Sequence, residues 1–423
     1  MTTMTLEDVN LADPGNFVAS VPHEMFAVLR REAPVWFHPD TDDTKGFWCI
    51  VKYADVVELS RDYPHASSEL GGITLNDMST EDLELQRQMM LMMDPPKHTK
   101  LRLLVNKGFT PRMIGRLDEH IREVTNGIVD EVAARGECDF VVDVAAELPL
   151  QVIAEMMGVP QSDRHKIFEW SNRLIGSEDP EYNVSREEAL DAATEMFMYS
   201  TELAESKHAN PGDDIISTLL QAEVEGNRLT DAEFNLFFQL LAVAGNETTR
   251  NLISNGMNFL FEHPDQRTKL AADPSLLPAA IDEMLRYASP VMYMRRTAPA
   301  DFELRGETIR AGDKMALWYI SANRDEEVFD DPNTFDITRT PNDYVAFGGG
   351  GPHFCLGANL AKLEIRVMFE TVLDRLPDIE LAGDVQRLRS NFINGIKHMP
   401  VRFSRHPGER ASLQHRPGAA TPP

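Results

Sequence analysis

Cys355 lies in a glycine-rich loop directly before a predicted helix, and this position favours a metal-binding thiolate. The loop reads Phe347-Gly-Gly-Gly-Gly-Pro-His-Phe-Cys-Leu-Gly357, and helical periodicity follows over 358–375. Glycines lack Cβ atoms and let the backbone approach a flat, bulky group, while the N-terminus of the helix directs N–H groups at the sulfur and stabilises its anion. We interpret Cys355 as a candidate axial ligand of haem iron, which predicts oxygen activation because a thiolate favours O–O cleavage. The alternative is a buried structural cysteine beside a helix cap.

A second polar cluster interrupts a long apolar helix that the sequence predicts over about 231–262. Thr230 and Glu233 form a capping box at its start, and His263-Pro264 ends it. The apolar residues of this helix point in most directions, so we expect it to be buried on nearly all sides. The segment Ala244-Gly-Asn-Glu-Thr-Thr249 therefore places an acid and two hydroxyls where desolvation is costly. These groups favour proton delivery to a reaction centre, although a bend caused by the threonine hydroxyls would also explain them.

Together these two segments resemble the cytochrome P450 monooxygenases. The loop around Cys355 is similar to the haem-binding loop of that family, and Glu247-Thr248 is similar to its oxygen-activation motif. The resemblance covers about 15–403 and implies haem b (iron protoporphyrin IX) as the cofactor, with Cys355 as the axial ligand of its iron. One departure is the position of Phe347, which stands eight residues before Cys355. The commonest family spacing is one residue shorter, so the packing of Phe347 near the sulfur is left open.

The resemblance also implies roles for other residues. Thr248 is expected to hydrogen-bond the oxygen substrate, and Glu247 is expected to belong to the proton relay. The residues expected to contact haem are His98, Arg102, Ala244, Gly245, Arg296, Phe347, Gly351, His353 and Gly357. His98 and Arg102 share one helix face, and they would bind the haem propionates together with Arg296 and His353. Arg295 adjoins Arg296, but strand alternation puts the two on opposite faces. Taken singly, each cation would fit an ordinary surface position as well.

Glu283 and Arg286 lie three residues apart on a helix predicted over 275–287. Such spacing is by itself typical of a surface ion pair. The resemblance implies instead a buried structural pair, with Arg339 as its third member.

Several segments resemble bacterial cytochromes P450 that oxidise methyl-branched lipids, isoprenoids and sterol side chains, often at the chain end. These segments are 244–251, 291–297, 317–325 and 394–397. The implied substrate is a long apolar molecule. The side chains expected to line its pocket, each of which would also suit plain core, are Ile73, Thr74, Leu75, Met89, Met90, Met92, Met93, Val243, Val291, Met292, Met294, Phe392 and Ile393.

Hydrophobic periodicity predicts a mainly α-helical protein with a small β region, as the cytochrome P450 fold requires. Further helices are expected at 112–134, 149–157, 186–206 and 213–225, and strands at 47–51, 302–305, 314–318 and 400–403. No linker composition interrupts the chain. We therefore expect one domain over 15–403, between a flexible N-terminus at 1–14 and a disordered tail, rich in proline, glycine and alanine, at 404–423.

The composition excludes several other classes of protein. A net charge of −27 argues against binding to nucleic acid, whose phosphates would be repelled. Three scattered cysteines are too few for a disulfide framework. Neither a signal segment nor a run of about 20 apolar residues is present, so we expect a cytoplasmic protein without a membrane anchor.

One stretch of this acidic chain is basic. From 95 to 117 there is no Asp or Glu, while the basic residues there are Lys97, Lys100, Arg102, Lys107, Arg112 and Arg116. This stretch is either a solvated helix face or a docking surface for an acidic redox protein. The resemblance implies a ferredoxin, reduced in turn by a ferredoxin reductase.

The resulting hypothesis is a haem-thiolate monooxygenase that uses O2 to hydroxylate an unactivated C–H bond, in particular a terminal methyl group. One alternative is a haem-bound lipid-binding or sensing protein without turnover, which would have no reason to bury Glu247 and Thr248. A peroxide-driven enzyme would need an arginine or other carboxylate-binding group near 240–248, and none is present there. A monooxygenase for a different apolar secondary metabolite is the remaining alternative.

Overall fold

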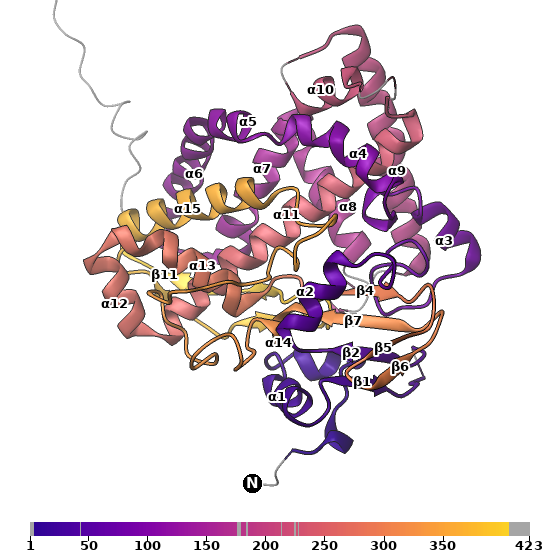
Figure 1. Ribbon diagram of the computed structural model, residues 1–423. Coiled ribbons are helices and arrows are strands. Elements are labelled where there is room, and N and C mark those ends of the chain that lie inside the picture. The colour runs from indigo at the N-terminus through magenta and orange to yellow at the C-terminus, as the bar shows by residue number, and fades with distance from the viewer. Residues whose placement is uncertain are drawn as a thin grey trace, which may run out of the picture.

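Helices form most of the molecule, and small sheets lie to one side of them (Figure 1). The computed structural model describes residues 4–42, 44–175, 179–182, 185–212, 214–223, 226 and 228–405. The α-helices are α1 His23–Glu32, α2 Tyr53–Arg61, α3 Thr80–Gln86, α4 Lys97–Val105, α5 Pro111–Arg116, α6 Asp118–Ala133, α7 Glu147–Met156, α8 Arg164–Ile175, α9 Arg186–Ala209, α10 Ile215–Gln221, α11 Asp231–Glu262, α12 Pro264–Ala272, α13 Leu277–Ala288, α14 Tyr319–Ala322 and α15 Ala358–Arg375.

The largest sheet has four strands in the order β1-β2-β7-β4. Its β2 and β7 run parallel, and the other pairs are antiparallel. The remaining sheets are β3-β11-β8, β9-β10 and β5-β6. The strands are β1 Val35–His38, β2 Phe47–Ile50, β3 Glu137–Asp139, β4 Tyr293–Thr297, β5 Phe302–Leu304, β6 Glu307–Ile309, β7 Lys314–Trp318, β8 Glu380–Leu381, β9 Gln386–Arg387, β10 Ile396–His398 and β11 Pro400–Arg402.

Helix α11 runs through the middle of the helical body (Figure 1) and packs against α7, α9, α13 and α15. Its predicted bounds and its burial are confirmed. The capping box is also present, because the Glu233 N–H donates to Thr230 Oγ1 at 3.2 Å and the Thr230 N–H donates to Glu233 Oε2 at 3.0 Å. A buried helix of this length gives the side chains at its centre a fixed position inside the protein.

The predicted fold class is confirmed, and most elements lie where the periodicity placed them. The helix over 358–375 and the strand over 314–318 match α15 and β7. The helix expected at 112–134 is instead two helices, α5 and α6, and α10 is shorter than predicted. Strands as short as β3, β8 and β9 were missed, since two or three residues carry no detectable alternation.

The packed part of the chain begins before the predicted boundary at residue 15. Val9 and Leu11 are buried in a hydrophobic cluster with Trp318 of the large sheet. The tail expected at 404–423 lies almost entirely outside the described residues, which end at 405. Among the described residues, no helix is long and apolar enough to cross a bilayer.

Candidate active site

The loop before α15 is closed by its own backbone. The Cys355 N–H donates to the Phe347 carbonyl at 3.0 Å, and Gly348, Gly350 and Gly351 adopt positive φ angles that favour glycine. A Cβ on Gly351 would lie 2.5 Å from the Ser60 carbonyl oxygen of α2. The glycines therefore let the loop pack against α2. Gly351 is not part of the cavity wall, contrary to the expected contact with the cofactor.

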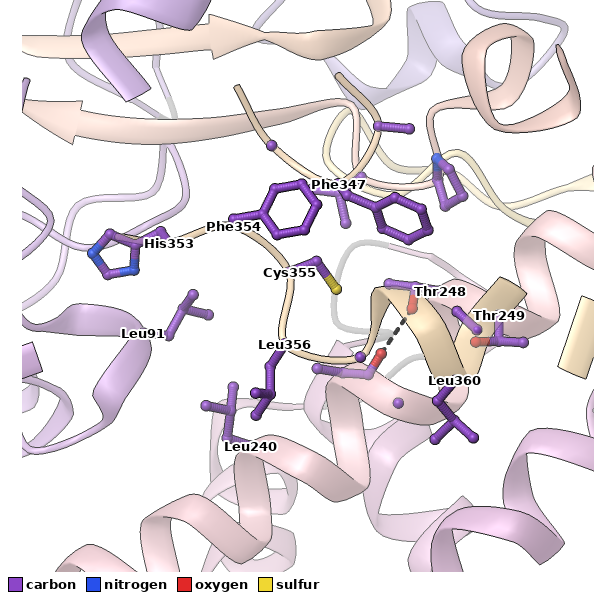
Figure 2. A pocket seen from close by; sticks show the side chains of 18 of the residues that line it. Leu91, Leu240, Thr248, Thr249, Phe347, His353, Phe354, Cys355, Leu356 and Leu360 are labelled. Atoms are coloured by element: carbon purple, nitrogen blue, oxygen red, sulfur yellow. Dashed lines mark hydrogen bonds between the residues drawn. The ribbon is translucent and has the colours of Figure 1, made fainter. Parts of the chain in front are cut away.

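Cys355 itself lies on the wall of a cavity between the loop and α11. Figure 2 shows its sulfur pointing into this space, with Phe347 and Phe354 beside it. The two phenylalanine ring centroids are 6.4 Å apart, and both rings line the cavity together with Cys355. Burial raises the pKa of the Cys355 thiol, while the N–H groups of Gly357 and Ala358 and the charge of Arg102 act in the opposite direction. The helix N-terminus thus favours the thiolate as expected.

The opposite wall is one face of α11. The residues on it recur every three to four positions, as one helix face requires, and are Phe237, Leu240, Leu241, Ala244, Gly245, Thr248, Thr249 and Leu252. The Thr248 hydroxyl donates to the Ala244 carbonyl at 2.8 Å (Figure 2). A Cβ on Gly245 would lie 3.1 Å from Ile153 Cδ1, so this glycine lets α7 approach α11 closely. Thr248 is therefore held beside the cavity on a rigid element, and α11 stays helical through it.

Glu247 lies off this face and does not line the cavity. It is buried and forms an ion pair with Arg250, one turn along the same helix. Burial raises the pKa of the Glu247 carboxyl, and the charge of Arg250 and its hydrogen bond oppose that shift. In this conformation Glu247 has no direct path to the cavity, unlike the position expected for a member of the proton relay.

Two imidazoles and two guanidinium groups meet at one end of the cavity. His98 and His353 have ring centroids 4.3 Å apart, and Arg102 and Arg296 line the same wall. Burial, with the charge of Arg102, lowers the pKa of His98 to about 4. Burial, with Arg296 and His98, lowers that of His353 to about 2, so both rings are neutral at physiological pH. Arg295 turns away from the cavity and donates to the carbonyls of Thr74 and Asn76 at 3.3 Å.

This group of residues fits an anion that carries two carboxylates. Neither Arg102 nor Arg296 forms an ion pair with a described residue, although Arg296 is buried. The Nδ1 atom of His98 is also buried without a hydrogen-bond partner among the described residues. Burying a cation without a counter-charge is costly, so the arrangement indicates anionic partners supplied by a bound group. Haem has this chemistry, because it combines two propionates with an iron for Cys355.

Comparison with known proteins agrees with this site. Residues 145–387 match the family model for Cytochrome P450. The chain belongs to the cytochrome P450 family. Haem b is therefore its cofactor, and when bound it supplies the activation of O2 for insertion of one oxygen atom into a substrate. The cavity end formed by His98, Arg102, Arg296 and His353 would hold the propionates, and Cys355 the iron.

Relatives of this cytochrome P450 include monooxygenases with named substrates. A "Steroid C26-monooxygenase" of Mycobacterium tuberculosis is 46% identical over 93% of this chain and 92% of its own length. A "Methyl-branched lipid omega-hydroxylase" of the same organism is 44% identical over 90% of each chain. Among solved structures, a Mycobacterium marinum cytochrome P450 in complex with pseudoionone has a TM-score of 0.87 and 39% identity, and the match covers 95% of this chain and all of that one.

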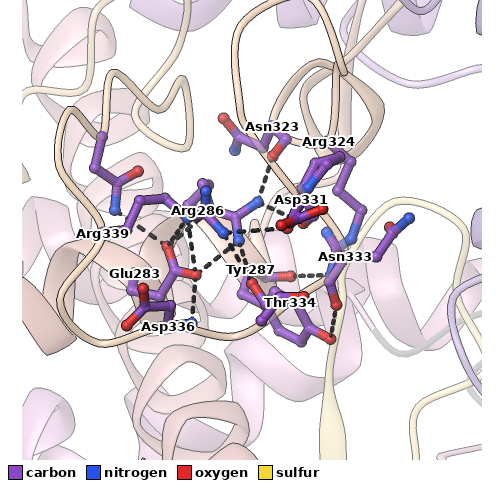
Figure 3. Close-up of polar contacts among 12 residues, drawn as sticks. Glu283, Arg286, Tyr287, Asn323, Arg324, Asp331, Asn333, Thr334, Asp336 and Arg339 are labelled. Atoms are coloured by element: carbon purple, nitrogen blue, oxygen red, sulfur yellow. Dashed lines mark hydrogen bonds and ion pairs between the residues drawn. The ribbon is translucent and has the colours of Figure 1, made fainter.

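A buried ionic network supports the cytochrome P450 fold away from the cavity (Figure 3). Glu283 and Arg286 of α13 are fully buried and pair at 2.7 Å, and Arg339 Nε lies 3.2 Å from Glu283. Arg286 also donates to the carbonyls of Asn323 and Pro332 at 2.8 Å. The network therefore ties α13 to the irregular segment between α14 and the Cys355 loop. Its position agrees with the structural role predicted for these three residues.

The structure divides the residues predicted for the substrate pocket. Met90, Val291 and Met294 line the cavity. Leu75, Met292 and Phe392 pack instead in the cluster around Trp318. The other predicted residues do not line the cavity either, and they are Ile73, Thr74, Met89, Met92, Met93, Val243 and Ile393. Alternation along β4 is the physical reason for part of this division, because Met294 and Arg296 share the face that is turned to the cavity.

Other lining residues were missed from the sequence. They are Leu91, Phe109, Phe237, Leu240, Leu241, Leu252, Pro290 and Glu364, among others. Counting back from Thr248 by helical turns would have found Leu241 and Phe237, since they share its face of α11. Nothing in the sequence indicated that Glu364 lines the cavity, because a glutamate on the helix after the loop is typical of a solvated position.

Proposed function

We propose that this cytochrome P450 hydroxylates the terminal methyl group of a methyl-branched lipid, an isoprenoid or a sterol side chain, with O2 and electrons from a ferredoxin. The observation that carries the proposal is the apolar lining of the cavity, shared among α11, α15, β4 and their flanking segments. The names of the relatives support it, since they describe oxidation at chain ends of steroids and branched lipids.

The charges of the cavity fit a substrate that is neutral, or whose charged group lies far from the carbon atom to be oxidised. Its ionisable lining residues are His98, Arg102, Arg296, Tyr319, His353, Cys355 and Glu364. The four basic groups are those that match haem, so none is left on the described wall for a substrate carboxylate. A polar headgroup would therefore lie towards the entrance, and the apolar chain end would lie near Thr248. Terminal C–H bonds are stronger than internal or tertiary ones, so this orientation must keep weaker bonds away from the reaction centre.

The competing functions have less support. A peroxide-driven enzyme needs a cation to bind the substrate carboxylate near the reaction centre, and 240–248 contains none. A binding protein without turnover would not match relatives that are named as monooxygenases over most of the chain. A different apolar secondary metabolite is compatible with the same cavity, so the substrate class must be tested directly.

Binding of the substrate can be measured from the haem absorption spectrum of the purified protein. We expect sterols with an intact side chain, methyl-branched fatty acids and isoprenoids to displace the iron-bound water and shift the Soret band, with saturating titrations. A matched control is a sterol of the same nucleus without the side chain, which should bind more weakly. Spectral shifts with small polar aromatics and none with the apolar chains would contradict the proposed substrate class.

The basic stretch provides a docking surface for an acidic ferredoxin. His98 and Arg102 of α4 line the cavity, whereas Lys97 and Lys100 of the same helix are exposed. Arg112 on α5 is exposed too, and none of these three exposed cations forms an ion pair with a described residue. A partner bound here would be separated from the cavity by one helix.

We propose that the protein works in the cytoplasm, where three isolated cysteines would remain reduced.

Reversing the charges of Lys97, Lys100 and Arg112 to glutamate should raise the apparent ferredoxin KM by about tenfold at low salt, because electrostatic attraction speeds encounter with an acidic partner. The effect should shrink as salt screens the charges. Steady-state turnover over a salt series measures it. The control reverses Arg31, Arg310 and Arg402, which are exposed elsewhere on the surface, with the same change in net charge. Equal KM values for the two triple variants would contradict the docking surface.

A further inference from the structure

Asn394 is a buried asparagine whose polar groups bind four other parts of the fold. It lies in the segment 388–395, between β9 and β10. Its backbone N–H donates to the Pro290 carbonyl at 2.9 Å, and its side-chain amide donates to the Ala288 carbonyl at the end of α13. Its side-chain oxygen accepts a hydrogen bond from Arg387 of β9, and its backbone carbonyl accepts one from Asn255 of α11 at 2.8 Å.

A second set of contacts fixes the same segment against α11. The Ile396 N–H donates to Asn251 Oδ1 at 3.3 Å, and the side chain of Asn255 also donates to the Asn251 carbonyl at 2.8 Å. Both asparagines have 0% exposure. A Cβ on Gly395 would lie 3.2 Å from Asn251 Oδ1 and 3.0 Å from Leu388 Cβ. This glycine therefore lets the segment 388–395 approach the helix closely.

The segment 388–395 supports a part of the cavity wall. Pro290 and Val291 line the cavity, and Val291 pairs with Ile393 in an antiparallel bridge. The Met292 N–H donates to the Phe392 carbonyl at 2.8 Å. Since Ile393 and Phe392 do not line the cavity themselves, the segment holds the wall from behind.

The residue before this wall has a strained backbone. Ser289 is fully buried and has a φ of 42°, in the left-handed region that residues with a Cβ rarely adopt. Its hydroxyl accepts a hydrogen bond from the Asn323 side chain at 2.8 Å. Such a conformation costs free energy and persists only where the surrounding contacts fix it. The bonds from Asn394 to Ala288 and Pro290, on either side of Ser289, supply part of this constraint.

Asn251, Asn255 and Asn394 form an asparagine network, none of whose members lines the cavity. Apolar side chains would fill these positions without the cost of desolvating amide groups. Hydrogen bonds, however, fix both distance and direction, which apolar packing does not. Because Thr248 and Leu252 of α11 line the cavity, the network defines the spacing between this face of α11 and the wall that the segment 388–395 supports.

We propose that the asparagine network determines which carbon atom of the substrate is oxidised. It holds Pro290 and Val291 at a fixed distance from Thr248, so that a chain end fits between them while carbon atoms with weaker C–H bonds are kept away. A displacement of the wall would let those carbon atoms reach the reaction centre. The inference rests on the proposed hydroxylation at a chain end and adds the positioning residues that enforce it.

Asn255→Ala tests the network, because it removes the bond to the Asn394 carbonyl. We expect the ratio of terminal-methyl to other hydroxylated products from a methyl-branched fatty acid to fall about fivefold, since a misplacement of about 1 Å can change a rate by about a hundredfold. Asn258→Ala is the matched control. Asn258 is also buried on α11, but its side chain donates to Glu262 of the same helix, so its variant should keep the wild-type ratio.

Gly395→Ala is a second variant, which keeps every side chain of the asparagine network. Its added methyl group would push the segment 388–395 away from α11, so the product ratio should fall in the same direction. Gly383→Ala is its control, because a Cβ there would lie 3.3 Å from Pro400 of β11 instead. If Asn255→Ala does not fold, the comparison of these two glycine variants decides the question.

Hydrogen exchange of the haem-loaded protein without substrate separates this inference from the substrate class. The Met292 and Asn394 amides join the wall to the segment 388–395, and they should exchange about tenfold faster in Asn255→Ala than in Asn258→Ala. Equal product ratios in these two variants, or an unchanged ratio in Gly395→Ala, would overturn the inference.

The wild-type products show which of the two proposals fails. If the wild type oxidises an internal carbon atom, hydroxylation at the chain end is wrong, but a ratio that changes in Asn255→Ala and not in Asn258→Ala still supports the network. If the wild type oxidises none of the lipids, the substrate class is wrong, and equal exchange rates in the two variants would overturn the network as well.

Discussion

Replacing Cys355 by serine is expected to abolish oxygenation while leaving a folded protein. The sulfur lies on the cavity wall opposite Thr248, and two backbone N–H groups direct hydrogen bonds at it. Only a thiolate supplies the electron density that favours O–O cleavage, and a serine hydroxyl does not. The reduced carbon monoxide complex should therefore lose its long-wavelength Soret band, and product formation should fall below detection.

Cys138→Ser provides the control for this experiment. Cys138 lies in β3, away from the cavity, and burial raises the pKa of its thiol to about 12, so it is not a thiolate. This variant should retain both the absorption band and turnover. A Cys355→Ser variant that kept the long-wavelength band would show that another residue binds the iron.

Replacing Glu283 by glutamine is expected to lower the free energy of unfolding by roughly 3 to 5 kcal/mol, because it leaves buried Arg286 without its counter-charge. Both side chains have 0% exposure, and Arg339 would lose the same partner. Chemical denaturation, followed by circular dichroism and by haem release, measures the change. The segment between α14 and the Cys355 loop should become more susceptible to proteolysis, since the network ties it to α13.

Asp282→Asn is a matched control on the preceding residue of the same helix. Asp282 pairs with Lys362, but both side chains are more than one-third exposed. Exposed pairs contribute up to about 1 kcal/mol, so this variant should stay close to the wild type. Equal losses of stability in the two variants would show that the buried network has no special role.

The long elements and the polar groups inside them could be predicted from the sequence. The capping box of α11 and the bounds of α15 follow from local signals, and these two helices bring Thr248 and Cys355 to opposite walls of one cavity. Alternation placed Arg295 and Arg296 on opposite faces of one strand, and the spacing to Ala298 selected Arg296. These features depend on residues that are close in the chain, and for this reason the sequence could predict them.

The features of the site that the sequence did not predict depend on contacts between segments far apart in the chain. The glycine loop packs against α2, which no property of the loop itself indicates. The choice of Arg250 as the partner of Glu247 is decided by side-chain orientation inside the fold. Substrate-pocket residues were the least predictable, because an apolar side chain such as Met292 fits a core as well as a cavity wall.

The central claim is oxygenation at a chain end, and product analysis with isotopically labelled O2 tests it most directly. The protein would be reconstituted with ferredoxin, ferredoxin reductase and reduced nicotinamide cofactor, and supplied with a methyl-branched fatty acid or a sterol with an intact side chain. We predict one labelled oxygen atom in the product, located by mass spectrometry on a terminal methyl carbon, with none from labelled water. Hydroxylation confined to the tertiary carbon or the ring system, or no product although the substrates shift the haem spectrum, would contradict the claim.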